Sequence, residues 1–132
     1  MHTIPSKVQL PPPFSDNRGT IQNLLEQSCG GVSIIHTKAG EYRSNHFHKT
    51  DGHWLYVLSG KMHYAEDKVE EGSRGYMRPD YPPFIEIAEG EMVWTGPLIW
   101  HRSFFPVDTV LISMSLRPRD HASHEEDVVR AP

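Results

Sequence analysis

The sequence predicts an all-β fold, a sandwich or barrel built from short strands. Short stretches rich in β-branched and aromatic side chains follow one another along the chain, and turn signals separate them about every 8 to 12 residues. The 132 residues include 10 glycines and 11 prolines, which supply these turns. No amphipathic pattern in the middle of the chain is long enough for a helix of three turns. Each expected element is taken below in chain order.

Residues 1–31 are expected to form an N-terminal arm with short strands. The arm, residues 1–15, is extended, because its three consecutive prolines lack backbone donors and clash with a preceding helical turn. A turn follows at residues 16–19, where asparagine, aspartate and glycine favour such a conformation. Residues 20–27 fit either a strand or a short helical turn, and the local pattern does not separate the two.

Residues 32–116 carry the strands of the predicted barrel. The clearest strand is WLYVL at 54–58, and a Ser-Gly-Lys turn joins it to a return strand, as in a hairpin. A charged loop is expected at 66–74 and an irregular segment at 79–83. The polar tail, residues 117–132, is helical or loose. The predicted strands are 32–37, 54–58, 61–65, 84–87, 92–95, 103–105 and 109–116.

Length, charge and cysteine content restrict the function classes. A chain of 132 residues and 15.1 kDa fits a single domain, residues 1–132. A formal net charge of −4 argues against nucleic-acid binding, which requires a basic face. No apolar run approaches the roughly 18 to 20 residues that span a bilayer, and the N-terminus lacks a signal-peptide core. Cys29 is the one cysteine and cannot form an intrachain disulfide. We expect a cytoplasmic protein.

Four of the nine histidines are spaced as metal ligands often are. His46 and His48 are two residues apart, so on a strand they face the same side, about 6 to 7 Å apart along the backbone. Two imidazoles at this spacing can converge on one divalent ion. His53 lies beside the next predicted strand, and His101 follows a later turn. The set predicts a divalent transition metal. Histidine ligands suit Zn, Fe, Ni, Mn or Cu and do not select among them.

The same segment resembles the first motif of the cupin superfamily. That motif has a glycine, His-x-His, a glutamate and a second glycine, and His53 stands here where the glutamate is expected. The second motif is looser: His101 fits it, but Leu98 replaces a glycine and Phe105 an asparagine. The resemblance covers residues 32–116. It implies a double-stranded β-helix, the cupin jelly-roll barrel, with a metal held by His46, His48, His53 and His101.

A narrower resemblance concerns enzymes of nucleotide-linked sugars. DNRG at 16–19 and RSNHFHK at 43–49 are similar to segments of dTDP-4-keto-6-deoxyglucose ketoisomerases and dTDP-4-dehydrorhamnose 3,5-epimerases, and to small cupins of polysaccharide biosynthesis. The resemblance implies isomerisation or epimerisation of a nucleotide-linked keto-sugar. His46 would be the base, and His48 its partner in the ketoisomerase case. Ser44 and Asn45 replace a glycine and a variable residue of the ketoisomerase segment.

Further candidates follow from this chemistry. A histidine that ligates a metal is not free to act as a base, so with metal bound the predicted base is His63, Tyr64 or another barrel residue. A homodimer is expected, because the Pro-rich arm has exposed apolar residues and no room for a core of its own. Cations near the predicted barrel mouth are candidates for holding a diphosphate or carboxylate: Arg18, Arg43, Lys49 and Arg102.

Two other functions remain open from the sequence. A histidine-ligated iron with open coordination positions would suit a metal-dependent dioxygenase or lyase. A non-catalytic module that binds a sugar or a metal is the third possibility. Substrate turnover separates the module from both enzymes, and oxygen consumption separates the oxygenase from the isomerase.

Overall fold

The computed structural model describes residues 6–68 and 83–131, which form β-strands and one seven-residue helix. The all-β prediction is confirmed. No helix among these residues has the length and apolarity needed to cross a membrane. The elements are β1 Ser6–Lys7, β2 Phe14–Asp16, β3 Gly19–Ile21, β4 Gly31–Thr37, β5 Tyr42–His48, β6 His53–Ser59, β7 Lys61–Lys68, β8 Ile85–Ala88, β9 Met92–Thr95, β10 Ile99–Phe104, β11 Thr109–Ser115, α1 His121–Asp127 and β12 Val128–Arg130.

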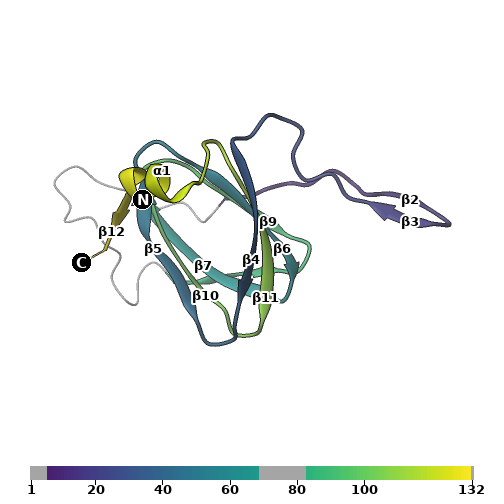
Figure 1. Ribbon diagram of the computed structural model, residues 1–132. Coiled ribbons are helices and arrows are strands. Elements are labelled where there is room, and N and C mark those ends of the chain that lie inside the picture. The colour runs from purple at the N-terminus through teal and green to yellow at the C-terminus, as the bar shows by residue number, and fades with distance from the viewer. Residues whose placement is uncertain (1–5, 69–82, 132) are drawn as a thin grey trace.

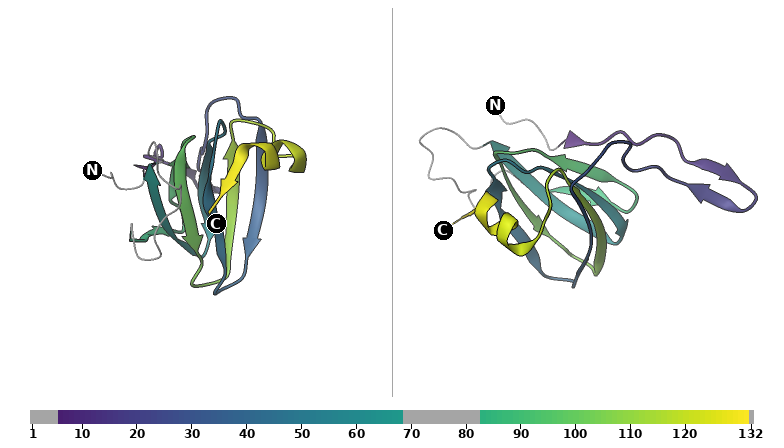
Figure 2. Two further views of the ribbon diagram at one scale, coloured as in Figure 1. Left: turned by 90° about the vertical axis from the view of Figure 1, so that its left-hand side faces the viewer. Right: turned by 45° about the horizontal axis from the view of Figure 1, so that its top comes forward.

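Two antiparallel five-stranded sheets pack face to face in a jelly roll (Figures 1 and 2). One sheet has the order β1-β9-β6-β11-β4, and the other has the order β12-β5-β10-β7-β8. Side chains alternate along the strands, so every second residue of β6 and β7 points inward. Both sheets contribute to one apolar core, which consists of Leu55, Val57, Met62, Tyr64, Ile87, Val93, Phe105 and Leu111.

Several strand limits differ from the prediction. The predicted loop at 66–74 is wrong at its start, because β7 continues to Lys68 and buries Glu66 opposite His101 of β10. The rest of that loop and residues 79–82 lie outside the described residues. β10 begins at Ile99, four residues earlier than predicted. Residues 20–27 are strand only as far as Ile21, and neither helix nor strand follows.

The polar tail is ordered by contacts with the barrel. Asp120 caps α1 by accepting a hydrogen bond from the backbone N–H of Ser123. β12 then adds to the edge of β5, with Val128 opposite His48. The β12–β5 pairing joins residues about 80 positions apart, so no local sequence pattern reports it. The tail therefore lies against the strand that carries His46 and His48 (Figure 1).

The β2–β3 hairpin projects away from the barrel (Figures 1 and 2). Phe14 and Ile21 face each other in its register, and their side chains are 59% and 60% exposed. On the edge strand β4, Val32 and Ile34 are also exposed. Apolar side chains gathered on a projecting hairpin and a sheet edge favour association with another copy. We propose a homodimer that uses this hairpin.

Replacing both Phe14 and Ile21 by serine is expected to dissociate the homodimer without unfolding the barrel, because both side chains are already exposed in one chain. The molar mass measured by light scattering after gel filtration would then fall from twice the chain mass to the 15.1 kDa of one chain. Val107→Ser, an exposed apolar position between β10 and β11, is the control. A monomeric wild-type protein at micromolar concentration would contradict the proposal.

Candidate functional site

Four histidine rings meet inside the barrel. His46 and His48 come from β5, His53 begins β6, and His101 lies on β10 opposite His46. The ring centroid of His101 lies 4.6 Å from that of His46, 5.5 Å from that of His48 and 5.2 Å from that of His53. Three strands that are separate in sequence thus bring these imidazoles together. His46 and His48 share the inner face because side chains on a strand alternate with a period of two. His101 lies beside them because β10 pairs with β5.

Three of these histidines form the tightest set of ligand atoms. One ring nitrogen from each of His46, His48 and His101 lies within 4.8 Å of the other two. Three nitrogens that each lie about 2.0 to 2.1 Å from one ion are within about 4.2 Å of one another, so a small adjustment suffices. His53 is adjacent but outside this set. We name His46, His48 and His101 the histidine triad.

A bulge in β5 sets which side chains face the interior. Ser44 and Asn45 have φ values of 73° and 70°, and the register between β5 and β10 shifts at this point. One extra residue reverses the alternation, so Arg43 lines the same cavity as His46. A positive φ favours glycine. Ser44 therefore has a backbone conformation that a glycine would adopt at lower cost.

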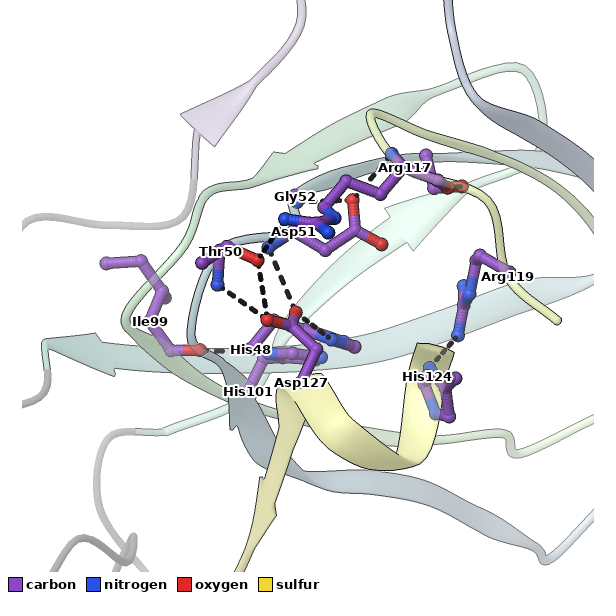
Figure 3. A network of polar contacts seen from close by, with 11 residues as sticks. His48, Thr50, Asp51, Gly52, Ile99, His101, Arg117, Arg119, His124 and Asp127 are labelled. Carbon is purple, nitrogen blue, oxygen red and sulfur yellow. Dashed lines mark hydrogen bonds and ion pairs between the residues drawn. The ribbon is translucent and has the colours of Figure 1, made fainter. Parts of the chain in front are cut away.

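A carbonyl oxygen orients one of the triad rings, and a carboxylate lies beside a second (Figure 3). Nδ1 of His101 lies 3.0 Å from the carbonyl oxygen of Ile99, which can only accept, so Nδ1 donates. Nδ1 of His48 lies 3.5 Å from a carboxylate oxygen of Asp127. In both rings Nε2 is buried and has no hydrogen-bond partner among the described residues. Carboxylates and carbonyls commonly orient metal-binding histidines in this way.

Asp127 is itself held by the loop between β5 and β6. One of its oxygens accepts hydrogen bonds from the backbone N–H and the hydroxyl of Thr50, at 2.8 and 2.7 Å. The other accepts from the backbone N–H of Asp51, at 3.0 Å. These bonds hold the pKa of Asp127 below its usual value, although burial alone would raise it. The carboxylate beside His48 is therefore charged at neutral pH.

The clustered imidazoles are neutral at pH 7. Burial, reinforced by the neighbouring histidines, lowers the pKa of His46 to about 2. Burial also lowers the pKa of His101 to about 3 and that of His53 well below 6.5. Burial and the charge of Arg119 lower the pKa of His48. Neutral imidazole is the form that binds metal ions.

A cavity of about 190 Å³ opens beside the triad. Two of its polar side chains, Arg119 and His124, belong to the polar tail, where the sequence analysis assigned no role. Arg119 donates to the hydroxyl of Ser113 at 3.2 Å and lies 3.5 Å from Nδ1 of His124. The ring of His124 lies 5.4 Å from that of His48. The lining residues are Ile35, Arg43, Ser44, His46, His53, Leu55, Ser103, Phe105, Leu111, Arg119 and His124.

Only one of the four predicted substrate-binding cations, Arg43, lines this cavity. Arg18 forms an ion pair with Asp16 on the projecting hairpin and is exposed. Lys49 lies on the outer surface beside α1. Arg102 faces the outside of β10, where its guanidinium lies 4.9 Å from the ring centroid of Phe84. In this chain the structure therefore does not bring Arg18, Lys49 or Arg102 to the histidine site.

The two predicted acid–base residues lie on opposite faces of β7. Nε2 of His63 lies 3.8 Å from Glu86, on the outer face, and does not reach the cavity. Tyr64 points inward, and its hydroxyl forms a hydrogen bond with that of Thr95. Its ring stacks 6.5 Å from that of His101, but it does not line the cavity. Burial, with the nearby Glu66, raises the pKa of Tyr64 well above 10. Tyr64 thus stays protonated at neutral pH.

No protein-family model matches the chain, and neither does any curated protein sequence. Solved structures do. A double mutant of the QdtA 3,4-ketoisomerase from Thermoanaerobacterium thermosaccharolyticum, in complex with TDP, is 21% identical, with a TM-score of 0.69 over 98% of this chain and 87% of that chain. A 3,4-ketoisomerase from Helicobacter canadensis is 16% identical, with a TM-score of 0.70 over 98% and 90%.

A dTDP-4-dehydrorhamnose 3,5-epimerase from Sulfolobus tokodaii is also similar, at 18% identity and a TM-score of 0.67 over 86% of this chain and 71% of that chain. These are the two enzyme groups whose segments the sequence resembles. At these identities the likeness establishes the architecture. The chain has the jelly-roll β fold of the cupins, the fold that the structurally similar sugar-nucleotide isomerases and epimerases share.

Proposed function

We propose that the protein is a metal-dependent isomerase or epimerase that moves a proton beside the carbonyl of a keto-sugar, with a nucleotide-linked sugar as the substrate class. The observation that carries this proposal is a cavity of about 190 Å³ lined by neutral histidines at the interior of the barrel. Fold similarity to dTDP-sugar isomerases and epimerases supports the substrate class. Proton transfer at a carbon next to a carbonyl needs a base, an acid and a group that stabilises the enolate oxygen.

The donor set fits a divalent transition metal. The histidine triad offers three nitrogens within 4.8 Å of one another, and Nε2 of both His48 and His101 lacks any other partner among the described residues. The Ile99 carbonyl orients the ring of His101, and the carboxylate of Asp127 lies 3.5 Å from Nδ1 of His48. When bound, the ion would act as a Lewis acid that polarises the substrate carbonyl.

His53 is the base in this proposal. Both of its ring nitrogens are buried without a hydrogen bond in the described part of the chain, and the side chain lines the cavity. With His46, His48 and His101 holding the ion, His53 keeps a free lone pair to take a proton from a substrate carbon. This differs from the role implied by the cupin resemblance, in which His53 is a fourth ligand.

His124 is placed to supply the proton. The guanidinium of Arg119 has donors only, so its contact with Nδ1 of His124 requires that this nitrogen accept. The neutral ring then carries its hydrogen on Nε2, which can donate to an oxygen or carbon of the substrate. His124 is half-buried and lines the same cavity as His53. In this proposal the two imidazoles act as base and acid within one cavity.

Solvent exchange tests this function directly. The zinc-, iron-, nickel- or manganese-loaded protein is incubated with dTDP- and GDP-linked 4-keto-6-deoxy sugars in deuterated water. Proton NMR is expected to show loss of signal at the ring carbons beside the carbonyl, even when net conversion is small. Absence of exchange with every sugar and metal would sink the proposal. Oxygen uptake in that case would support the dioxygenase, and sugar binding without turnover would support the binding module.

The His53→Gln variant separates the two roles of His53. We expect exchange at the sugar carbons to slow by at least ~100-fold, because general base catalysis contributes about 10²- to 10⁴-fold. Zinc binding is expected to stay within a few-fold of the wild type. The matched control is His63→Gln, on the outer face of β7, which should leave both quantities unchanged. Loss of zinc from His53→Gln would instead make His53 a metal ligand.

A further inference from the structure

The charge in the cavity has one sign. Its charged lining residues, within the described chain, are Arg43 and Arg119, and no aspartate or glutamate lines it. The other polar lining side chains are neutral imidazoles and the hydroxyls of two serines. A divalent ion on the histidine triad would add further positive charge. A low-dielectric space with this composition attracts a negatively charged ligand group.

Arg119 is the cation with unused binding capacity. It donates to Ser113 at 3.2 Å and meets His124 at a long 3.5 Å, and it makes no ion pair with a carboxylate in the described part of the chain. Arg43 is more committed, because it donates to the Thr37 hydroxyl at 2.7 Å and to the His36 carbonyl at 3.1 Å. A guanidinium carries five N–H donors in a planar fork, so most of those on Arg119 remain available.

Burial lowers the pKa of Arg119, and the negative charge of Asp51 offsets part of this lowering. Asp51 does not line the cavity, and one of its oxygens already accepts from the backbone N–H groups of Gly52 and Arg117, at 2.9 and 3.0 Å (Figure 3). Burying a cation without a direct partner is costly. A ligand oxyanion in the cavity would provide that partner.

The position of Arg119 decides which part of a ligand it would hold. Its side chain touches His124, whose ring lies 5.4 Å from that of His48 and 6.2 Å from that of His46. An anionic group on Arg119 therefore lies beside the histidine cluster, not at a remote end of a long substrate.

We infer that Arg119 forms an oxyanion subsite in the histidine-lined cavity, which selects a ligand with a carboxylate or phosphate group beside the histidine cluster. The planar fork of arginine fits either group through two parallel hydrogen bonds. This inference shares only the cavity with the proposed function. Binding of an anion by Arg119 does not require that the protein catalyse a reaction.

Calorimetric titration of the full chain at low ionic strength tests the subsite, with and without one equivalent of zinc. The probes are D-glucuronate, D-glucose 6-phosphate and D-glucose, which differ mainly at one carbon. We expect one or both anionic sugars to bind at least ~10-fold more tightly than glucose. The glucuronate and phosphate arms show which oxyanion the subsite prefers. Equal affinity for all three sugars, or binding of glucose alone, would overturn the inference.

Two variants assign the effect to Arg119. Arg119→Gln is expected to lower affinity for the anionic sugar by about 10- to 100-fold and to leave glucose binding unchanged, since charge-assisted hydrogen bonds are lost. Arg117→Gln is the matched control, because Arg117 bonds to Thr50 outside the cavity and should have no effect. Undiminished anion binding by Arg119→Gln would refute the subsite.

Arg119→Lys gives a second reading should Arg119→Gln fail to fold. Lysine keeps the charge but not the fork, so an intermediate affinity for the anion is expected, and unchanged affinity would contradict the planar contact. Thermal unfolding of each variant reports its folding. Deuterium exchange of keto-sugars by the same variants is measured separately, so failure of the subsite and failure of the isomerase function give different results.

Discussion

Joint replacement of His46 and His48 by alanine is expected to abolish stoichiometric zinc binding, lowering affinity by at least ~100-fold. The variant removes two of the three nitrogens that lie within 4.8 Å of one another, and His101 alone cannot hold the ion. Elemental analysis of untagged protein after dialysis against zinc measures the stoichiometry, and competition with a chromophoric chelator measures the affinity. The matched control is His36→Ala, an exposed histidine on β4.

Asp127→Asn refines this test. The asparagine retains the shape of the side chain but removes the charge 3.5 Å from Nδ1 of His48. Loss of such a supporting carboxylate commonly costs about 10- to 100-fold in metal affinity. The affinity of Asp127→Asn should therefore fall between those of the wild type and the double alanine variant. Full zinc occupancy in the double variant would exclude the histidine triad as the metal site.

The metal-free protein is expected to lose stability steeply as the pH falls below 6.5. Burial lowers the pKa of His46 to about 2 and that of His101 to about 3 in the folded state, whereas both titrate near 6.5 in the unfolded chain. Between pH 3 and pH 6.5 the unfolded state therefore binds more protons, and the free energy of unfolding decreases with decreasing pH. Above pH 6.5 the contribution is fully present.

The size of this effect follows from linkage. Between its folded-state and unfolded-state pKa, each histidine changes the free energy of unfolding by about 1.4 kcal/mol per pH unit. His46 and His101 together therefore change it by about 3 kcal/mol per pH unit. Urea unfolding at pH 7.5, 6.0 and 5.0, in the presence of a chelator, measures the slope. The variant with glutamine at both positions should show a much flatter dependence. Equal stability of the wild type at pH 7.5 and pH 5.0 would contradict the burial of neutral imidazoles.

Local periodicity in the sequence determined many of the barrel strands and part of the site. WLYVL at 54–58 alternates inward and outward as a strand must, and His46 and His48 share a face because side chains repeat every two residues. The same rule places His63 and Tyr64 on opposite faces of β7. Strand alternation alone therefore shows that at most one of the two side chains can point into the barrel. The predicted strands do not include β5, because its residues are mostly polar and show no apolar alternation.

Tertiary structure decided which distant residues complete the site. Arg119 and His124 lie in a tail with no apolar period. They reach the cavity because β12 pairs with β5, and because Asp127 at the end of α1 is bonded to the loop after β5. Arg43 faces inward because a bulge at Ser44 and Asn45 reverses the alternation of β5. Strand register, edge pairing and bulges depend on contacts between residues far apart in the chain, and local sequence patterns carry no information about such contacts.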